Sequence, residues 1–395
     1  MINDTRDTKE YLRTIRQIIN KRPGELTDRE ALTVIEQYVF GLPCTAGRTS
    51  RENGALIRKL FLMLRRELSI LQPLADDPAI TEIMVNGPRS IFVERNGHLE
   101  KADLFFDTEE ELEELIRRIA AGVHREINEL HPIVDARLSD GSRVNAVLGN
   151  IALNGPSLTI RKFPENRPME MADLIRSGTI RTEGADLLQK LVRARYNCFI
   201  SGGTSSGKTT LLNVLSRCIP SSERLVVIED SAELRIDQIE NLVRLECRSA
   251  NVQGRGGVDM ARLVRNSLRM RPDRIIVGEV RGSEVVHMIQ AMNTGHDGSM
   301  STGHANSVAG ILKRLEAMFL EAADIPVEAI RSQIAEGIDI IVHMSRMRDG
   351  SRRVTEIAEL DCVRDGRIRT NSLYRHDTGL TGNPLIHREK LEVWK

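Results

Sequence analysis

The chain has 395 residues, which is enough for roughly two or three domains. Its 56 basic residues balance 56 acidic ones, and only 3% of the residues are aromatic, so it lacks the positive field and the stacking side chains that favour nucleic acid. Five scattered cysteines form no C-x-x-C pair, which argues against a zinc site and indicates reduced thiols in a cytosol. No apolar signal sequence or membrane-spanning stretch is visible.

Residues 1–70 are highly charged and have a helical pattern. Apolar residues repeat at helical spacing from Ile57 to Leu68 and form one apolar face. The pattern predicts a helical extension or linker, with a partner-docking helix as the alternative.

A smaller α/β domain is predicted over residues 72–163. It combines a hairpin turning at Asn96-Gly97 with an amphipathic helix at residues 110–121. Short strands are expected at residues 83–88, 134–138, 143–147 and 158–163. Residues 164–176 begin with two prolines among polar residues, so they are the predicted linker.

From residue 177 to 395, apolar strands alternate with helices, which is typical of a parallel sheet covered by helices. The tail beyond residue 375 is rich in turn residues and is expected to be irregular.

Residues 202–209 match the phosphate-binding loop G-x-x-x-x-G-K-[ST] at every fixed position. An apolar strand precedes the loop and a helix follows it, which is the context that the motif requires. Lys208 would reach the β- and γ-phosphates of ATP, and the Thr209 hydroxyl would bind Mg²⁺. The predicted nucleotide-binding residues are Gly202, Gly203, Thr204, Ser205, Ser206, Gly207, Lys208, Thr209 and Thr210. A glycine turn within the core is the alternative.

A second apolar strand, at residues 225–228, runs into Glu229, Asp230 and Glu233. Carboxylates so close together repel one another unless a cation lies nearby. A role in Mg²⁺ binding or in positioning water is predicted, and a solvated acidic loop is the alternative.

A third apolar strand, at residues 275–277, ends in Gly278-Glu279. Many phosphate-loop enzymes have an Asp where this chain has Gly278. Glu279 alone is therefore predicted to polarise the attacking water, with a strand-capping surface Glu as the alternative.

His296 and His304 flank a short predicted strand in a glycine-rich segment. They are predicted to sense or contact the γ-phosphate, with structural histidines as the alternative. No third ligand has the spacing of a metal site.

These four motifs are the phosphate loop, the acidic segment at 229–233, Gly278-Glu279 and the histidine segment at 296–304. In this order they resemble the secretion-ATPase superfamily of type II and type IV secretion and type IV pili, over roughly residues 75–360. Residues 135–146 and 158–163 are similar to the branch that serves tight-adherence (Flp-type) pili, which also resembles the ATPases of type IV secretion systems. The missing C-x-x-C pair argues against the type II branch.

The resemblance implies a homo-hexameric ring in which ATP and Mg²⁺ lie between the N-terminal domain and a RecA-like domain. Arg143 and Arg161 would reach the phosphates and join Glu229, Glu279, His296 and His304 as catalytic residues. Hydrolysis would power assembly of a tight-adherence pilus or a related secretion system. The expected partners are inner-membrane platform proteins, so the chain would be cytoplasmic, attached to the membrane only through partners and without direct nucleic-acid contact.

Three other functions stay open. The leading alternative is a nucleic-acid translocase on the same RecA-like core, followed by a small-molecule kinase and a nucleotide-gated binding protein. The phosphate loop also departs from the family pattern at Ser205, where a Gly is usual. A Cβ at this position strains the loop if its φ angle is positive.

Overall fold

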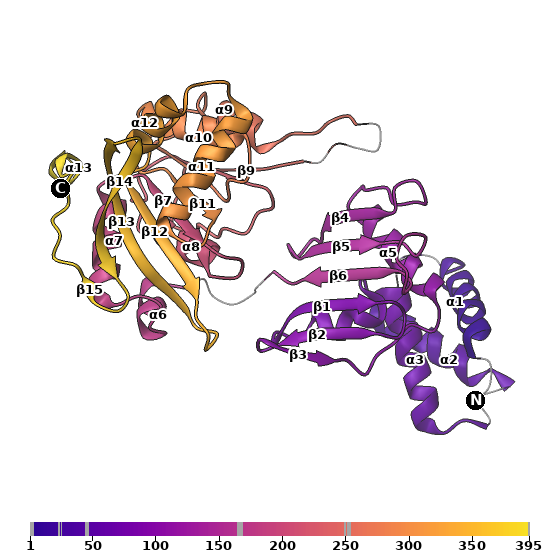
Figure 1. Ribbon diagram of the computed structural model, residues 1–395. Helices are drawn as coiled ribbons and strands as arrows, with labels where there is room; N and C mark the ends of the chain where they lie inside the picture. The colour runs from indigo at the N-terminus through magenta and orange to yellow at the C-terminus, as the bar shows by residue number, and fades with distance from the viewer. Residues whose placement is uncertain are drawn as a thin grey trace. The chain divides into compact units, whose positions relative to one another are not determined.

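The computed structural model describes residues 4–22, 24, 26–43, 47–163, 169–248, 250 and 254–393. The chain divides into two compact units, Met1–Asn166 and Arg167–Lys395 (Figure 1). The first part of the predicted linker, residues 164–168, lies outside the described residues, and its last residues form helix α6 of the second unit.

The first unit begins with helices that pack on its own α/β core. They are α1 (Asp4–Asn20), α2 (Asp28–Phe40), α3 (Ser50–Arg65), the short η2 (Ser69–Leu71) and α4 (Gln72–Ala75), and α5 (Glu109–Gly122) follows later. Thr27 and Thr49 start α2 and α3 with capping boxes. Buried side chains of α1 to α3 belong to the same apolar cluster as the sheet, so these helices are part of the first unit rather than a detached extension.

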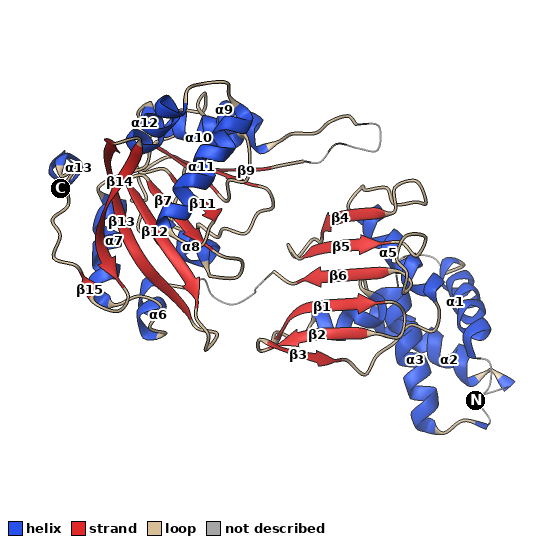
Figure 2. Ribbon diagram, viewed as in Figure 1, coloured by secondary structure: helices blue, strands red, loops and turns tan. Residues whose placement is uncertain are grey.

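The sheet of the first unit is antiparallel, in the order β3-β2-β1-β6-β5-β4 (Figure 2). Its strands are β1 (Ile80–Asn86), β2 (Ile91–Arg95), β3 (His98–Lys101), β4 (Ile133–Arg137), β5 (Arg143–Val147) and β6 (Ser157–Arg161). Asn96 and Gly97 both have positive φ angles, as the predicted hairpin turn requires. Alternate residues of the inner strands are buried, so one face of the sheet packs against the core and the other carries polar side chains.

The second unit contains a nine-stranded sheet in the order β15-β14-β13-β12-β7-β11-β10-β8-β9. Its strands are β7 (Cys198–Gly202), β8 (Leu225–Glu229), β9 (Leu242–Glu246), β10 (Arg274–Val277), β11 (Met300–His304), β12 (Ile340–Arg346), β13 (Arg352–Arg364), β14 (Arg367–Arg375) and β15 (Gly379–Leu380). The predicted parallel pairing holds from β12 to β9. Beyond β12, the three C-terminal strands add in antiparallel fashion, which the alternation of strands and helices did not predict.

The helices of the second unit are α6 (Met171–Arg176), α7 (Thr182–Arg193), α8 (Lys208–Ser216), α9 (Met260–Ser267), α10 (Glu284–Asn293), α11 (Val308–Ala322), α12 (Val327–Gly337) and α13 (Glu389–Val393). Two apolar clusters pack around the sheet. In the described ranges, no helix combines the length and the apolar character needed to cross a membrane.

The tail beyond residue 375 is more ordered than predicted, since it contains β15 and α13. Distant charged groups hold it in place. The Glu359 carboxylate accepts the N–H groups of Ile386 and His387, and Lys390 Nζ lies 2.7 Å from carboxylate oxygens of both Asp297 and Asp339. These contacts join positions far apart in the sequence, so the local pattern could not reveal them.

Candidate functional site

The phosphate-binding loop connects β7 to α8, and its backbone leaves donors open. Gly207 caps α8 with a φ angle of 97° and offers no side chain to the helix. Among the described residues, no group accepts a hydrogen bond from the N–H of Lys208, Thr209 or Thr210. A helix N-terminus with open donors attracts an anion, so the loop fits a phosphate group.

Ser205 has a φ angle of 57°, in the left-handed region that favours glycine. The strain anticipated for a Cβ at this position is therefore present. The Arg352 guanidinium holds the loop here, because its Nε donates to the Ser205 carbonyl over 3.2 Å.

Lys208 is almost fully buried and points back into the loop. Its Nζ donates to the carbonyls of Gly202 and Gly203 over 3.2 and 2.9 Å, and it lies 3.3 Å from His304 Nδ1. Burial lowers the pKa of Lys208, while the Glu279 carboxylate opposes that shift. The ammonium group thus contacts three acceptors, the two carbonyl oxygens and His304 Nδ1, which phosphate oxygens could replace.

His304 joins Lys208 to Glu279. Its Nε2 lies 3.0 Å from Glu279 Oε1, while Nδ1 faces the lysine. Since an ammonium group only donates, Nδ1 acts as acceptor and Nε2 carries the proton. Burial and the nearby Lys208 charge lower the pKa of His304, which agrees with this neutral form.

Glu279 follows β10 and is held by Arg281, which sequence reasoning did not single out. Arg281 Nε and Nη2 donate to the two carboxylate oxygens over 2.8 and 3.0 Å. Burial raises the pKa of Glu279, but the hydrogen bond and charge of Arg281, together with His304 and Lys208, lower it further than burial raises it. Glu279 is therefore an ionised carboxylate that can accept a proton from water.

Glu229 ends β8, the strand that pairs with β10, and is buried. Its Oε1 accepts the N–H groups of Glu233 and Leu234 over 2.7 and 2.9 Å, and burial raises its pKa. A Cβ added at Gly278 would lie 3.1 Å from Glu229 Cγ. A side chain at position 278 would therefore press against Glu229.

The predicted metal ligands are Thr209, Asp230 and Glu233. In the described part of the chain, no group of three His, Cys, Asp or Glu side chains is arranged to hold a metal ion. Mg²⁺ needs only one or two protein ligands beside water and phosphate oxygens, so a site made of Thr209 and one carboxylate stays a prediction.

His296 does not lie with His304. It precedes β11 at the amino end of the strand, whereas His304 ends the strand next to Gly202. Its Nδ1 lies 3.2 Å from the Ala291 carbonyl oxygen. The structure brings only His304 to the phosphate loop.

His343 is a buried histidine that sequence reasoning missed. It pairs in register with Ser201 of β7, and its Nδ1 lies 3.2 Å from the Ser201 hydroxyl. Burial lowers its pKa. A single His within an apolar strand matches no sequence motif, so the sequence held no signal that identified His343 as a site residue.

Arg143 and Arg161 belong to the first unit, where they are direct cross-strand partners on β5 and β6. Arg137 of β4 lies opposite Arg143 in turn, so three arginines form a row across three strands. On its other side Arg161 lies opposite Glu82 of β1, so the row continues into an acidic residue.

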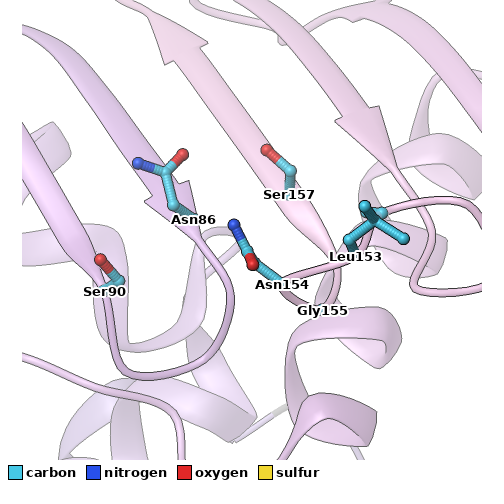
Figure 3. Close-up of a pocket in the computed structure, with 7 residues that line it drawn as sticks. Asn86, Ser90, Leu153, Asn154, Gly155 and Ser157 are labelled. Atoms are coloured by element: carbon cyan, nitrogen blue, oxygen red, sulfur yellow. The ribbon is translucent and has the colours of Figure 1, made fainter.

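The first unit also contains a cavity of about 570 Å³ at the end of β1 and the start of β6 (Figure 3). Asn86, Ser90, Asn154 and Ser157 give it a polar lining, and the exposed Leu153 lies at its edge. No ionisable side chain lines it, so it offers no acid, base or phosphate-binding cation.

Residues 65–377 match the family described as Type II/IV secretion system protein. A putative conjugal transfer protein of Mycobacterium tuberculosis is 36% identical over 81% of this chain and 92% of its own length. The probable conjugal transfer protein TrbB of Sinorhizobium fredii is 35% identical over 82% of this chain and 95% of its own.

Among solved structures, the ATPase DotB of Legionella pneumophila superposes with a TM-score of 0.54. It is 23% identical and covers 74% of this chain and 80% of its own length, so it supports the fold alone. The expected α/β fold with a RecA-like second unit is confirmed. The chain belongs to the type II/IV secretion system protein family.

Proposed function

We propose that this member of the type II/IV secretion family hydrolyses ATP at the phosphate loop. The supporting observation is the contact chain from Lys208 through His304 to Glu279. It lies at the carboxyl ends of parallel strands β7, β11 and β10, where ligands of open α/β sheets bind.

In this proposal the loop N–H groups bind the phosphates, and Lys208 leaves the Gly202 and Gly203 carbonyls for phosphate oxygens. Glu279 accepts a proton as water attacks the γ-phosphorus, and the bond to the β–γ bridging oxygen breaks to release ADP and phosphate. Mg²⁺, held by Thr209 and a carboxylate of the 229–233 segment, would neutralise charge on the phosphates.

ATP turnover tests the proposal. Lys208→Ala is expected to lose nucleotide binding, and Glu279→Gln to keep binding while turnover falls by about 100-fold or more. Lys190→Ala, which changes an exposed lysine of α7, serves as the control. Near-normal turnover in either site variant would overturn the assignment.

We also propose that Arg143 and Arg161 bind nucleotide phosphate in the assembled protein. Arginine stays charged and forks onto phosphate oxygens, which suits both side chains to this contact. Alanine at either position is expected to reduce turnover by at least about tenfold, because charge-assisted bonds to phosphate are strong. Arg117→Ala, on α5 of the same unit, should turn over normally.

We propose that ATP hydrolysis powers the assembly of a tight-adherence pilus or a related secretion system. The chain would act as a hexamer that binds inner-membrane platform proteins. The names of the relatives, conjugal transfer proteins, support a macromolecular transfer machine more broadly. Light scattering with and without a non-hydrolysable ATP analogue tests the ring, and a monomer in both states contradicts it. ATPase stimulation by DNA that weakens with salt would instead favour the translocase.

A further inference from the structure

The hairpin formed by β12 and β13 carries a concentration of positive charge. Residues 346–353 contain four arginines and one acid, Asp349. The Asp349 carboxylate accepts both the N–H and the hydroxyl of Ser351, so it is engaged in the turn. Gly350, with a φ angle of 81°, completes this turn. The hairpin is therefore well formed, and its single acid cannot balance the charge of four arginines.

Arg346 and Arg352 are cross-strand partners at the base of this turn. Directly opposed residues of an antiparallel pair project from the same face, within reach of one another. In the described residues, neither guanidinium has a carboxylate within 4.0 Å, whereas Arg375 on the neighbouring β14 pairs with Glu356. Two opposed like charges cost stability, so this pair favours an anion between or beside them.

The face that carries this pair lies against the phosphate loop. Arg352 Nε donates to the Ser205 carbonyl, and a Cβ added at Gly207 would lie 3.3 Å from Arg352 Cδ. The same Cβ would lie 3.4 Å from Met344 Cε, and Met344 precedes Arg346 by two residues on the same strand. Arg352 is thus beside Gly207, where α8 presents its open N–H groups, and Arg346 lies directly across the hairpin from Arg352.

We propose that Arg346 and Arg352 form a second phosphate-binding element, which contacts the phosphate tail of the nucleotide held by the loop. This inference rests on the proposed nucleotide binding and assigns to it two residues outside the loop. One N–H of Arg352 is used on Ser205, and the other four are open to an anion among the described residues. A guanidinium stays charged and forks onto phosphate oxygens, which suits it to this contact.

Calorimetric titration of the full chain with ADP, and separately with inorganic pyrophosphate, tests the inference. Arg346→Ala and Arg352→Ala are each expected to lower the affinity for both ligands by about tenfold, because charge-assisted hydrogen bonds are lost. Arg353→Ala is the matched control, because Arg353 projects from the other face and its Nη1 donates to the Ser177 carbonyl. It should bind both ligands as the unchanged chain does.

The outcomes separate this inference from the proposed function. If Lys208→Ala binds ADP as tightly as the unchanged chain, nucleotide binding at the loop fails. If Lys208→Ala loses ADP while both hairpin variants bind like Arg353→Ala, the second element is refuted. If the hairpin variants lose affinity for ADP but not for pyrophosphate, the second phosphate-binding element is also refuted, because the arginines would then contact the nucleoside. Should Arg352→Ala not fold, Arg346→Ala decides alone, because Arg346 is exposed and its side chain has no hydrogen-bond or ion-pair partner among the described residues.

Discussion

Arg281 donates two parallel hydrogen bonds, of 2.8 and 3.0 Å, to the carboxylate of Glu279. His304 contacts Oε1 of the same carboxylate, so Oε2 has fewer partners and is the oxygen better placed to accept from water. Arg281 therefore keeps Glu279 ionised and fixes which way the carboxylate turns.

Arg281→Ala should move the acidic limb of the ATPase pH profile to higher pH. Without the guanidinium, burial is less opposed and the pKa of Glu279 rises, so protonation removes the base at a pH where the unchanged enzyme still works. The measurement is kcat/KM against pH. Arg281→Lys keeps the positive charge but cannot donate two parallel hydrogen bonds. The acidic limb of its pH profile should therefore lie between those of the unchanged enzyme and Arg281→Ala. Superimposable profiles for all three proteins would contradict the role.

Ser205→Gly should stabilise the protein by up to about 1 kcal/mol, because a left-handed φ costs a residue with a Cβ that much. For a unit of this size the gain corresponds to a rise of about 2–4 °C in Tm. Ser206→Gly is the control in the same loop, since Ser206 has no positive φ and gains flexibility without losing strain. Equal changes in Tm for the two variants would show that strain at Ser205 is negligible.

Local patterns carried enough information to predict the loop, the Asn96-Gly97 hairpin, the strand that ends in Glu229 and the strand that precedes Glu279. Each depends on residues close together in the sequence, where turn chemistry and apolar periodicity act. The Lys208–His304 contact spans 96 residues and the contact of Arg352 with Ser205 spans 147, so neither has a local signal. The antiparallel β13 and β14 were missed for the same reason, because strand direction is set by the sheet and not by the strand's own residues.

Gly278→Asp should destabilise the protein without improving turnover, although it restores the acid that many phosphate-loop enzymes have. The new Cβ would press on Glu229 Cγ, and the new charge would lie beside a carboxylate whose pKa burial already raises. Gly278→Ala tests the steric part alone, which should cost about 1 kcal/mol. Thermal unfolding at pH 7.5 and 5.5 measures both variants. An Asp variant as stable as the Ala variant at pH 7.5 would contradict the charge argument.

His304 should make stability depend on pH in a predictable direction. Its pKa in the folded chain lies below the ordinary 6.5, so folding favours the neutral ring, which accepts from Lys208 and donates to Glu279. This contribution is complete above the unfolded pKa and declines as the pH falls through 6.5 toward the folded pKa, because the unfolded chain then binds the proton more readily.

His304→Gln replaces the ring with an amide that donates and accepts but does not titrate. Between pH 8 and pH 5.5, the unchanged chain is expected to lose a few degrees more of Tm than this variant, on the order of the shift that 1 kcal/mol produces in a domain of this size. His287→Gln, on α10, is the control because, among the described residues, that imidazole has a polar contact with the Gln290 side chain alone, on its own helix. If all three proteins lose Tm equally, the neutral bridge between Lys208 and Glu279 does not contribute to stability.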